Sequence, residues 1–167
     1  MKHGQFILSI LVANHFGVLT RVSGLFARRG FNIDSLSVGE TDNPDFSRMT
    51  IMATGDAYTE DQIVKQLEKL HDVKYIELMD ARNTVIRELM IVKIKAEQGK
   101  RGELIEAVTV FRGKVVDFSP HSISVEITGE QSKIEAFVEY VKPYGIMELC
   151  RTGTTALGRG NSCIIKE

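Results

Sequence analysis

The spacing of apolar residues over the first 79 positions predicts four strands and two helices. An almost continuous apolar run at residues 5–13 is typical of a central strand that is covered on at least one face. Apolar residues then recur at helical spacing over residues 18–26 and again over residues 63–70. The other segments with a strand-like pattern are 31–41, 47–55 and 73–79. The predicted order of elements is therefore β-α-β-β-α-β.

This order indicates a ferredoxin-like arrangement, in which four antiparallel strands carry two helices on one face. Right-handed crossovers would place the first and third strands in the centre and leave the second and fourth as edges. Two cations and Gly30 suit the carbonyl end of the first helix. The residues from Thr59 to Gln62 resemble a capping box, which predicts the start of the second helix.

The second half of the chain repeats the pattern after a short polar linker at residues 80–84. Strand-like segments lie at 85–96, 114–119, 121–128 and 144–151, with helical spacing at 103–111 and 134–141. The letters also repeat, because the segment from Arg29 to Asp34 aligns with that from Arg112 to Asp117. We therefore predict an α+β fold of two ferredoxin-like domains, residues 1–79 and 85–152. The glycine-containing residues 153–167 are expected to form a mobile tail or one ordered by a partner.

The loop that leads into the first helix is the best candidate for a ligand site. Asn14 and Gly17 precede Val18, where the helical pattern begins, so the backbone N–H groups of the first turn would be open to an anion. Asn32 follows the helix and carries both donors and acceptors. Ordinary structural roles explain the same residues: Asn14 as a plain N-cap, Gly17 as a turn residue and Asn32 as the residue that enters a strand. The matching loop at residues 98–102 has no Asn-x-x-Gly motif, and Val115 stands where Asn32 would be.

Composition narrows the class of protein. The chain has 167 residues, 43% of them apolar, a net charge of −1 and a pI of about 6.4. These values fit one ordinary domain or two small ones, and they argue against a nucleic-acid-binding protein. Cys150 and Cys163, without a signal-peptide pattern, indicate a reducing cytosol, and no apolar run approaches the roughly 20 residues of a membrane span. We expect a cytoplasmic protein.

Motifs for catalysis or metal binding are missing from the sequence. It contains no phosphate-binding GxxxxGK[ST] loop and no GxSxG elbow for a nucleophile. The histidines are scattered singly, without the spacing of metal ligands, at His3, His15, His71 and His121. An enzyme built on this fold is an alternative that would require turnover by the chain alone.

Several segments together resemble one known family. They are Asn14-x-x-Gly17-Val-Leu, the stretch from Gly24 to Leu36, Ser47-Arg-Met-Thr50, and, in the second half, residues 87–94 and 111–117. The chain is similar over its whole length to the small, regulatory subunit of acetohydroxyacid synthase, also called acetolactate synthase. Its first half resembles an ACT domain, an amino-acid-sensing module, and its second half resembles the carboxy-terminal domain of that family.

This resemblance implies a protein without catalytic activity or cofactors of its own. In the family, a large subunit carries thiamine diphosphate, Mg and FAD and opens the biosynthesis of valine, leucine and isoleucine. The small subunit binds the large one, raises its activity and confers feedback inhibition by valine. Carried over to this chain, the effector-binding residues would be Asn14, Gly17, Val18, Leu19, Asn32 and Ile33.

The resemblance and the chemistry of these residues together give a specific expectation. The carboxylate of an amino acid would lie on the N–H groups of residues 17–19, its polar groups would contact Asn14 and Asn32, and its isopropyl group would contact Val18 and Ile33. The second strand, as an edge, would join two copies into a homodimer with Asn32 near the two-fold axis. Neither nucleic acid nor membrane is expected as a partner.

Another class of function shares this fold. Modules of the β-α-β-β-α-β type also serve as effector domains of ligand-responsive transcription regulators or in other amino-acid sensors. A transcription regulator needs a DNA-binding segment, and the chain has neither a helix-turn-helix pattern nor a basic arm.

Overall fold

The computed structural model describes residues 4–165. The chain divides into two compact units, one made of residues up to 86 together with those from 154 onward, the other of residues 87–153. The boundary thus falls slightly after the linker expected from the sequence, where residues 81–83 form a turn of 3-10 helix.

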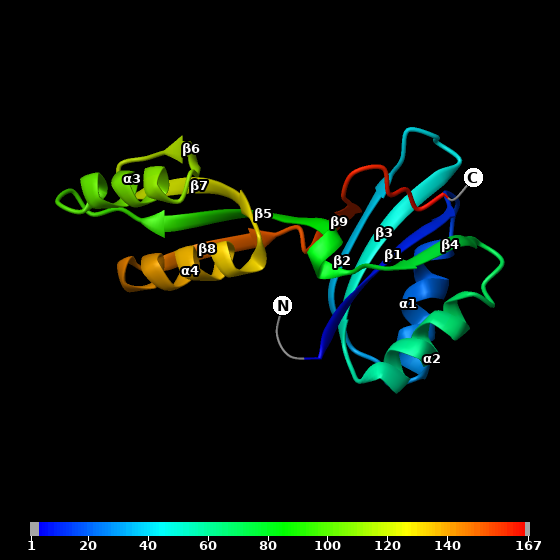
Figure 1. Cartoon of the computed structure of the whole chain (residues 1–167). Coiled ribbons are helices and arrows are strands. Elements are labelled where there is room, and N and C mark those ends of the chain that lie inside the picture. The colour runs from blue at the N-terminus through cyan, green and yellow to red at the C-terminus, as the bar shows by residue number, and fades with distance from the viewer. Residues whose placement is uncertain (1–3, 166–167) are drawn as a thin grey trace. The chain divides into compact units, whose positions relative to one another are not determined.

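The first unit has the predicted order of elements (Figure 1). They are β1 (Gln5–Ala13), α1 (Val18–Arg28), β2 (Ile33–Glu40), β3 (Phe46–Thr54), α2 (Ala57–Leu67) and β4 (Val73–Leu78). The sheet is antiparallel with the strand order β2-β3-β1-β4. This confirms that the first and third strands are central and that β2 is an edge.

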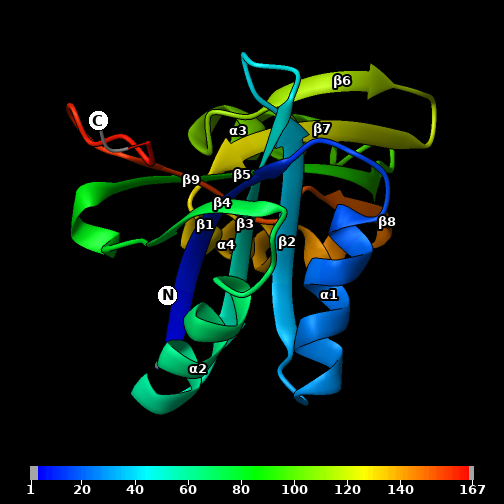
Figure 2. The same cartoon turned by 90° about the vertical axis from the view of Figure 1, so that its right-hand side faces the viewer.

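Both helices of this unit cover the same face of the sheet. In β1, Phe6, Leu8, Ile10 and Val12 alternate toward that face and pack against residues of α1 and α2 such as Phe26. Figure 2 shows α1 and α2 in front of the sheet, and the two helices contact each other. The side chain of Val18, the first residue of α1, is part of this core and is 3% exposed.

The second unit repeats the arrangement, as the sequence predicts. It contains β5 (Thr84–Lys95), α3 (Arg101–Val110), β6 (Lys114–Phe118), β7 (Ser122–Gly129), α4 (Gln131–Val141) and β8 (Ile146–Arg151). Its antiparallel sheet has the order β6-β7-β5-β8 and a core of its own, with Phe137 fully buried. A 3-10 turn at Lys142–Tyr144 separates α4 from β8.

The start of α2 differs from the prediction. The helix begins at Ala57, and the cap is Asp56, whose Oδ1 accepts hydrogen bonds from the Thr59 N–H at 2.8 Å and from Thr59 Oγ1 at 2.7 Å. Thr59 therefore lies in the first turn and is capped by Asp56. An aspartate accepts from the third helical residue as well as a threonine would, which is why the pattern at residue 59 misplaced the cap.

Residues 154–165 also differ from the expectation of a mobile tail, while residues 166 and 167 lie outside the described residues. The segment contains β9 (Thr155–Gly158), which pairs with β5, and it belongs to the first unit. Ala156 is 2% exposed and packs with Ile7, Met52 and Met79 on the sheet face opposite α1 and α2. The glycines and polar residues concealed this because the contact with Ile7, Met52 and Met79 comes from one small apolar side chain, that of Ala156.

Two hydrogen bonds fasten the same segment to β2. The Thr154 N–H donates to Ser35 Oγ at 2.8 Å, and the hydroxyls of Ser37 and Thr155 lie 3.1 Å apart.

Burial on this face also lowers the pKa of Arg48, although the charges of Glu77 and Cys163 oppose that shift. The segment thus covers part of the sheet face that the helices leave open.

Candidate functional site

Gly17 is the N-cap of α1 and leaves the backbone N–H groups of the first turn without a side-chain cap. This residue caps the helix in a left-handed conformation, with φ 85° and ψ −7°, and no side chain caps the helix there. A side chain at this φ would be strained, which explains the need for glycine. The first-turn N–H groups have no acceptor one turn earlier, although the Val18 N–H makes a long 3.4 Å hydrogen bond to the His15 carbonyl.

Asn14 is fixed against the hairpin between β2 and β3. Its Nδ2 donates to Glu40 Oε2 at 3.2 Å and to the Pro44 carbonyl at 2.9 Å, while its Oδ1 accepts from Ser47 Oγ at 3.0 Å. The Asn14 N–H also donates to the Asp45 carbonyl at 2.7 Å. The Asn14 side chain therefore has a defined orientation, and Glu40 adds a negative charge beside it.

A second set of contacts anchors the same loop from the other side. Asp72 accepts from Arg21 Nε at 2.7 Å and lies 3.0 Å from His15 Nε2. Burial by itself raises the pKa of the Asp72 carboxyl, but the hydrogen bond and charge of Arg21, helped by His15, lower it more, so the pKa lies below its ordinary value. The loop and the first turn of α1 are thus tied to the residue before β4.

Of the two apolar residues expected at the start of α1, Val18 is buried and Leu19 is exposed. The Val18 side chain is in the core and 3% exposed, so within one chain Val18 offers a ligand mainly its backbone, and its expected contact with an isopropyl group stays a prediction. The helix must bury one residue of its first turn against the sheet, and Val18 occupies that position. Leu19 is 43% exposed, as expected for a residue that could meet a ligand or a partner.

Asn32 and Ile33 lie at the opposite end of α1 from Gly17. The helix has 11 residues, which at 1.5 Å per residue is a length of roughly 16 Å. Asn32 Nδ2 donates to Asp34 Oδ1 at 2.7 Å, and Ile33 is half-buried against the core. Within one chain, the structure therefore brings Asn14, Gly17, Val18 and Leu19 together but not Asn32 and Ile33.

The sequence reasoning missed the residues that hold Asn14, namely Glu40, Pro44 and Ser47. A signal was available, because residues 42–45 are a turn-forming cluster and the predicted strand order places this hairpin beside the end of β1. What the pattern could not provide is which side chains of the hairpin meet the loop.

The described residues were expected to lack a metal site and a membrane span, and two findings concern these features. Across residues 4–165, no three or more His, Cys, Asp or Glu side chains gather in a way that could hold a metal ion. In the same range, the helices are too short or too polar to cross a membrane.

Two family models match the chain, and together they cover most of it. Residues 8–75 match the "AHAS small subunit-like ACT domain", and residues 87–160 match the "small subunit of acetolactate synthase". The chain belongs to the acetolactate synthase small-subunit family. It is thus a small regulatory subunit of the branched-chain amino acid pathway enzyme acetolactate synthase, whose catalysis resides in the large subunit.

Acetolactate synthase small subunits from other organisms are similar to this chain over nearly their full length. A probable acetolactate synthase small subunit of Methanothermobacter thermautotrophicus is 48% identical over 96% of each chain. The acetolactate synthase small subunit of Mycobacterium bovis is 47% identical over 92% of this chain and 91% of its own. The crystal structure of the small subunit from Thermotoga maritima, 41% identical, has a TM-score of 0.88 and covers 95% of this chain and 99% of that one.

Proposed function

We propose that this small subunit binds the catalytic large subunit, raises its activity and makes it sensitive to feedback inhibition by valine. The observation that carries the proposal is the uncapped amino end of α1, held open by Gly17 next to the fixed Asn14 and Glu40. A helix amino terminus attracts a carboxylate through its N–H groups and its partial positive charge. The Glu40 carboxylate, whose Oε2 accepts a hydrogen bond from Asn14 Nδ2 at 3.2 Å, suits the ammonium group of the same amino acid.

The two groups of expected effector residues lie at opposite ends of α1, and they would come together if two chains pair through β2. Strand β2 is an edge of its sheet, and edge strands pair readily with a second copy. Antiparallel pairing about a two-fold axis between Leu36 and Ser37 would place Ile33 of the partner subunit opposite Glu40. Because Glu40 contacts Asn14, this arrangement brings Asn32 and Ile33 of the partner subunit toward Asn14 and Gly17.

Such a dimer explains how an amino acid could act as a regulator. The ligand would bridge the Asn14 end of one copy and the Asn32 end of the other, so that it stabilises one arrangement of the pair. Coupling of this kind commonly amounts to about 1–3 kcal/mol. Because a pocket discriminates one methylene group by only about 1–3 kcal/mol, we expect leucine and isoleucine to bind as well, although less tightly than valine.

The substitution Gly17→Asp tests the effector site directly. It introduces a negative charge where the valine carboxylate would lie, at a φ that disfavours any side chain. We expect the reconstituted holoenzyme to lose valine inhibition while the variant still activates the large subunit. Lys100→Asp, at the equivalent position in the second unit, is the matched control and should leave inhibition intact.

Calorimetric titration of the isolated small subunit separates binding from regulation. We expect saturable binding of valine, weaker binding of alanine, and loss of valine binding in Asn14→Ala, with folding checked by circular dichroism. Normal valine inhibition of the Gly17→Asp holoenzyme would refute the site. Inhibition that is lost together with activation would instead indicate damage to the surface that contacts the large subunit.

A further inference from the structure

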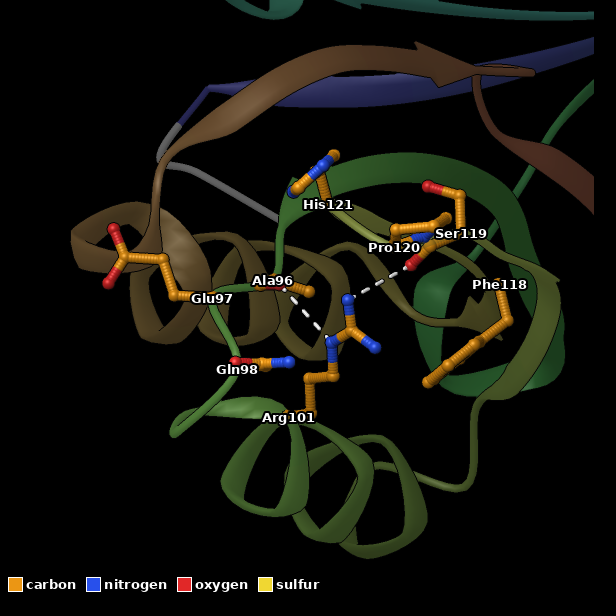
Figure 3. A pocket seen from close by; sticks show the side chains of 8 residues that line it. All are labelled: Ala96, Glu97, Gln98, Arg101, Phe118, Ser119, Pro120 and His121. Carbon is orange, nitrogen blue, oxygen red and sulfur yellow. Dashed lines mark hydrogen bonds between the residues drawn. The ribbon is translucent and has the colours of Figure 1, made fainter.

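The second unit contains a cavity of about 600 Å³ that none of the proposed effector residues line. Two segments form it, the loop from β5 into α3 and the turn between β6 and β7 (Figure 3). The lining residues are Ala96, Glu97, Gln98, Arg101, Phe118, Ser119, Pro120 and His121. The volume is within the range of roughly 300–1,000 Å³ that is typical of small-molecule sites.

The position of this cavity corresponds to that of the Asn14 loop in the first unit. In each unit, the loop from the first strand into the first helix meets the hairpin between the second and third strands. The Asn14 N–H donates to the Asp45 carbonyl at 2.7 Å in one unit, and the Ala96 N–H donates to the His121 carbonyl at 3.0 Å in the other. Helix α3, like α1, begins without a side-chain cap. The repeat thus preserves the architecture of the first loop and changes its side chains.

Arg101 supplies the charge of the cavity. Its Nε donates to the Ala96 carbonyl and its Nη2 to the Ser119 carbonyl, both at 3.3 Å, and the guanidinium lies 5.2 Å from the centre of the Phe118 ring. These contacts hold the half-buried side chain in one orientation without neutralising it, because no carboxylate of residues 4–165 forms an ion pair with it. A guanidinium has five N–H donors, so the Arg101 side chain retains N–H groups that could bind a ligand.

The other side chains restrict the kind of ligand. Figure 3 shows the Gln98 amide directed toward Arg101 and the Glu97 carboxylate directed away from it. Phe118, Pro120 and Ala96 present apolar surface, and His121 adds a polar ring to the lining. One fixed cation, an amide and apolar walls suit a singly charged anion with an apolar body. A phosphate group would favour several cations at the same point.

We propose that this cavity is a second ligand site, which binds a small carboxylate with an apolar body through Arg101 and Gln98. The site is independent of the effector site at Gly17, because it lies in the other unit and shares no residue with it. It would allow the small subunit to respond to a second metabolite.

The experiment is an NMR titration of the isotopically labelled full chain with acetate, butyrate and phenylacetate, and with inorganic phosphate for comparison. We expect each carboxylate to shift the backbone signals of residues 96–101 and 118–121, with affinity rising along the series as the apolar body grows. Signals of residues 14–19 and 32–33 report the effector site in the same spectra, so the outcome for one site does not decide the other.

The variant Gln98→Glu provides the decisive comparison. Gln98 is exposed and precedes α3, so the change adds a carboxylate to the cavity without removing a contact of Arg101. We expect carboxylate affinity to fall at least roughly tenfold, while the melting temperature stays the same or rises. Gln62→Glu on α2 is the matched control and should change neither. Absence of shifts at the cavity, phosphate binding as tight as that of the carboxylates, or unchanged affinity in Gln98→Glu would each overturn the proposal.

Discussion

The two units have the same order of strands and helices but differ where the first helix begins. In the first unit, Gly17 adopts a positive φ and Val18 enters the core. In the second, Lys100 adopts a φ of −108° and Arg101 remains half-buried with its guanidinium at a cavity. The shared fold therefore places a strand-to-helix loop at the same position in both units. The side chains at that position differ, so the first unit presents backbone N–H groups there and the second presents a cation.

The first unit also uses distant residues to cover the sheet face that its helices leave open. Ala156, from the segment after residue 153, packs there on Ile7 and Met52. Both of these side chains are almost completely buried. This part of the first unit therefore depends on residues that are distant from it in the sequence.

Ala156→Asp should have the largest effect on stability and should act on one unit only. It would bury a carboxylate against Ile7, Met52 and Met79, and we expect a loss of about 2–3 kcal/mol in the free energy of unfolding. Hydrogen exchange resolved by residue should show faster opening in the first unit and unchanged opening in the second.

Leu157→Asp is the matched control for this change. Leu157 is the next residue of β9 and is 55% exposed, so its replacement should cost little. Equal losses for both variants would show that the segment contributes through its backbone and not through the contact of Ala156.

The helix caps predict a smaller difference between the units. Asp56 caps α2 through its side chain, whereas Glu130, the corresponding residue before α4, makes no such bond. Asp56→Ala should therefore lower the free energy of unfolding by about 1 kcal/mol. Glu130→Ala should have less effect, and chemical denaturation of both variants measures the difference. A larger loss for Glu130→Ala would contradict the assigned caps.

The smallest expected effect concerns pH. The pKa of Asp72 is lowered in the folded chain, so its ionised form stabilises the fold above the ordinary carboxyl pKa of about 3.9. This contribution is lost as the pH falls through the lowered pKa, which is the sign expected for a depressed carboxyl. Asp72→Asn should make the first unit less dependent on pH in this acidic range, as thermal melts between pH 2 and pH 6 would show. An unchanged pH profile would contradict this role of Asp72.

Most of the fold follows from the spacing of apolar residues. The nearly continuous run in β1 and the alternation in β3 predicted central strands, and the repeat predicted the second unit. These patterns succeed because each strand and helix must bury a face against its own neighbours. The glycine at position 17 was equally informative, since its positive φ is a local property.

The features that escaped prediction depend on contacts between distant segments. The hydrogen bonds of Asn14 to Glu40 and Ser47 join a loop to a hairpin about thirty residues away. The packing of Ala156 on Ile7 spans almost the whole chain. No periodicity marks such pairs. The burial of Val18, by contrast, follows from the helical spacing that begins at this residue.

The return of residues 154–165 to the first unit affects how the protein is made. The second unit is inserted between the two parts of the first, so the ribosome synthesises all of residues 87–153 before Ala156 emerges. At about 5–20 residues per second, this delay is on the order of several seconds. During that time, Ile7, Met52 and Met79 lack the side chain that later covers them. The unit that begins first at the amino terminus is therefore completed last.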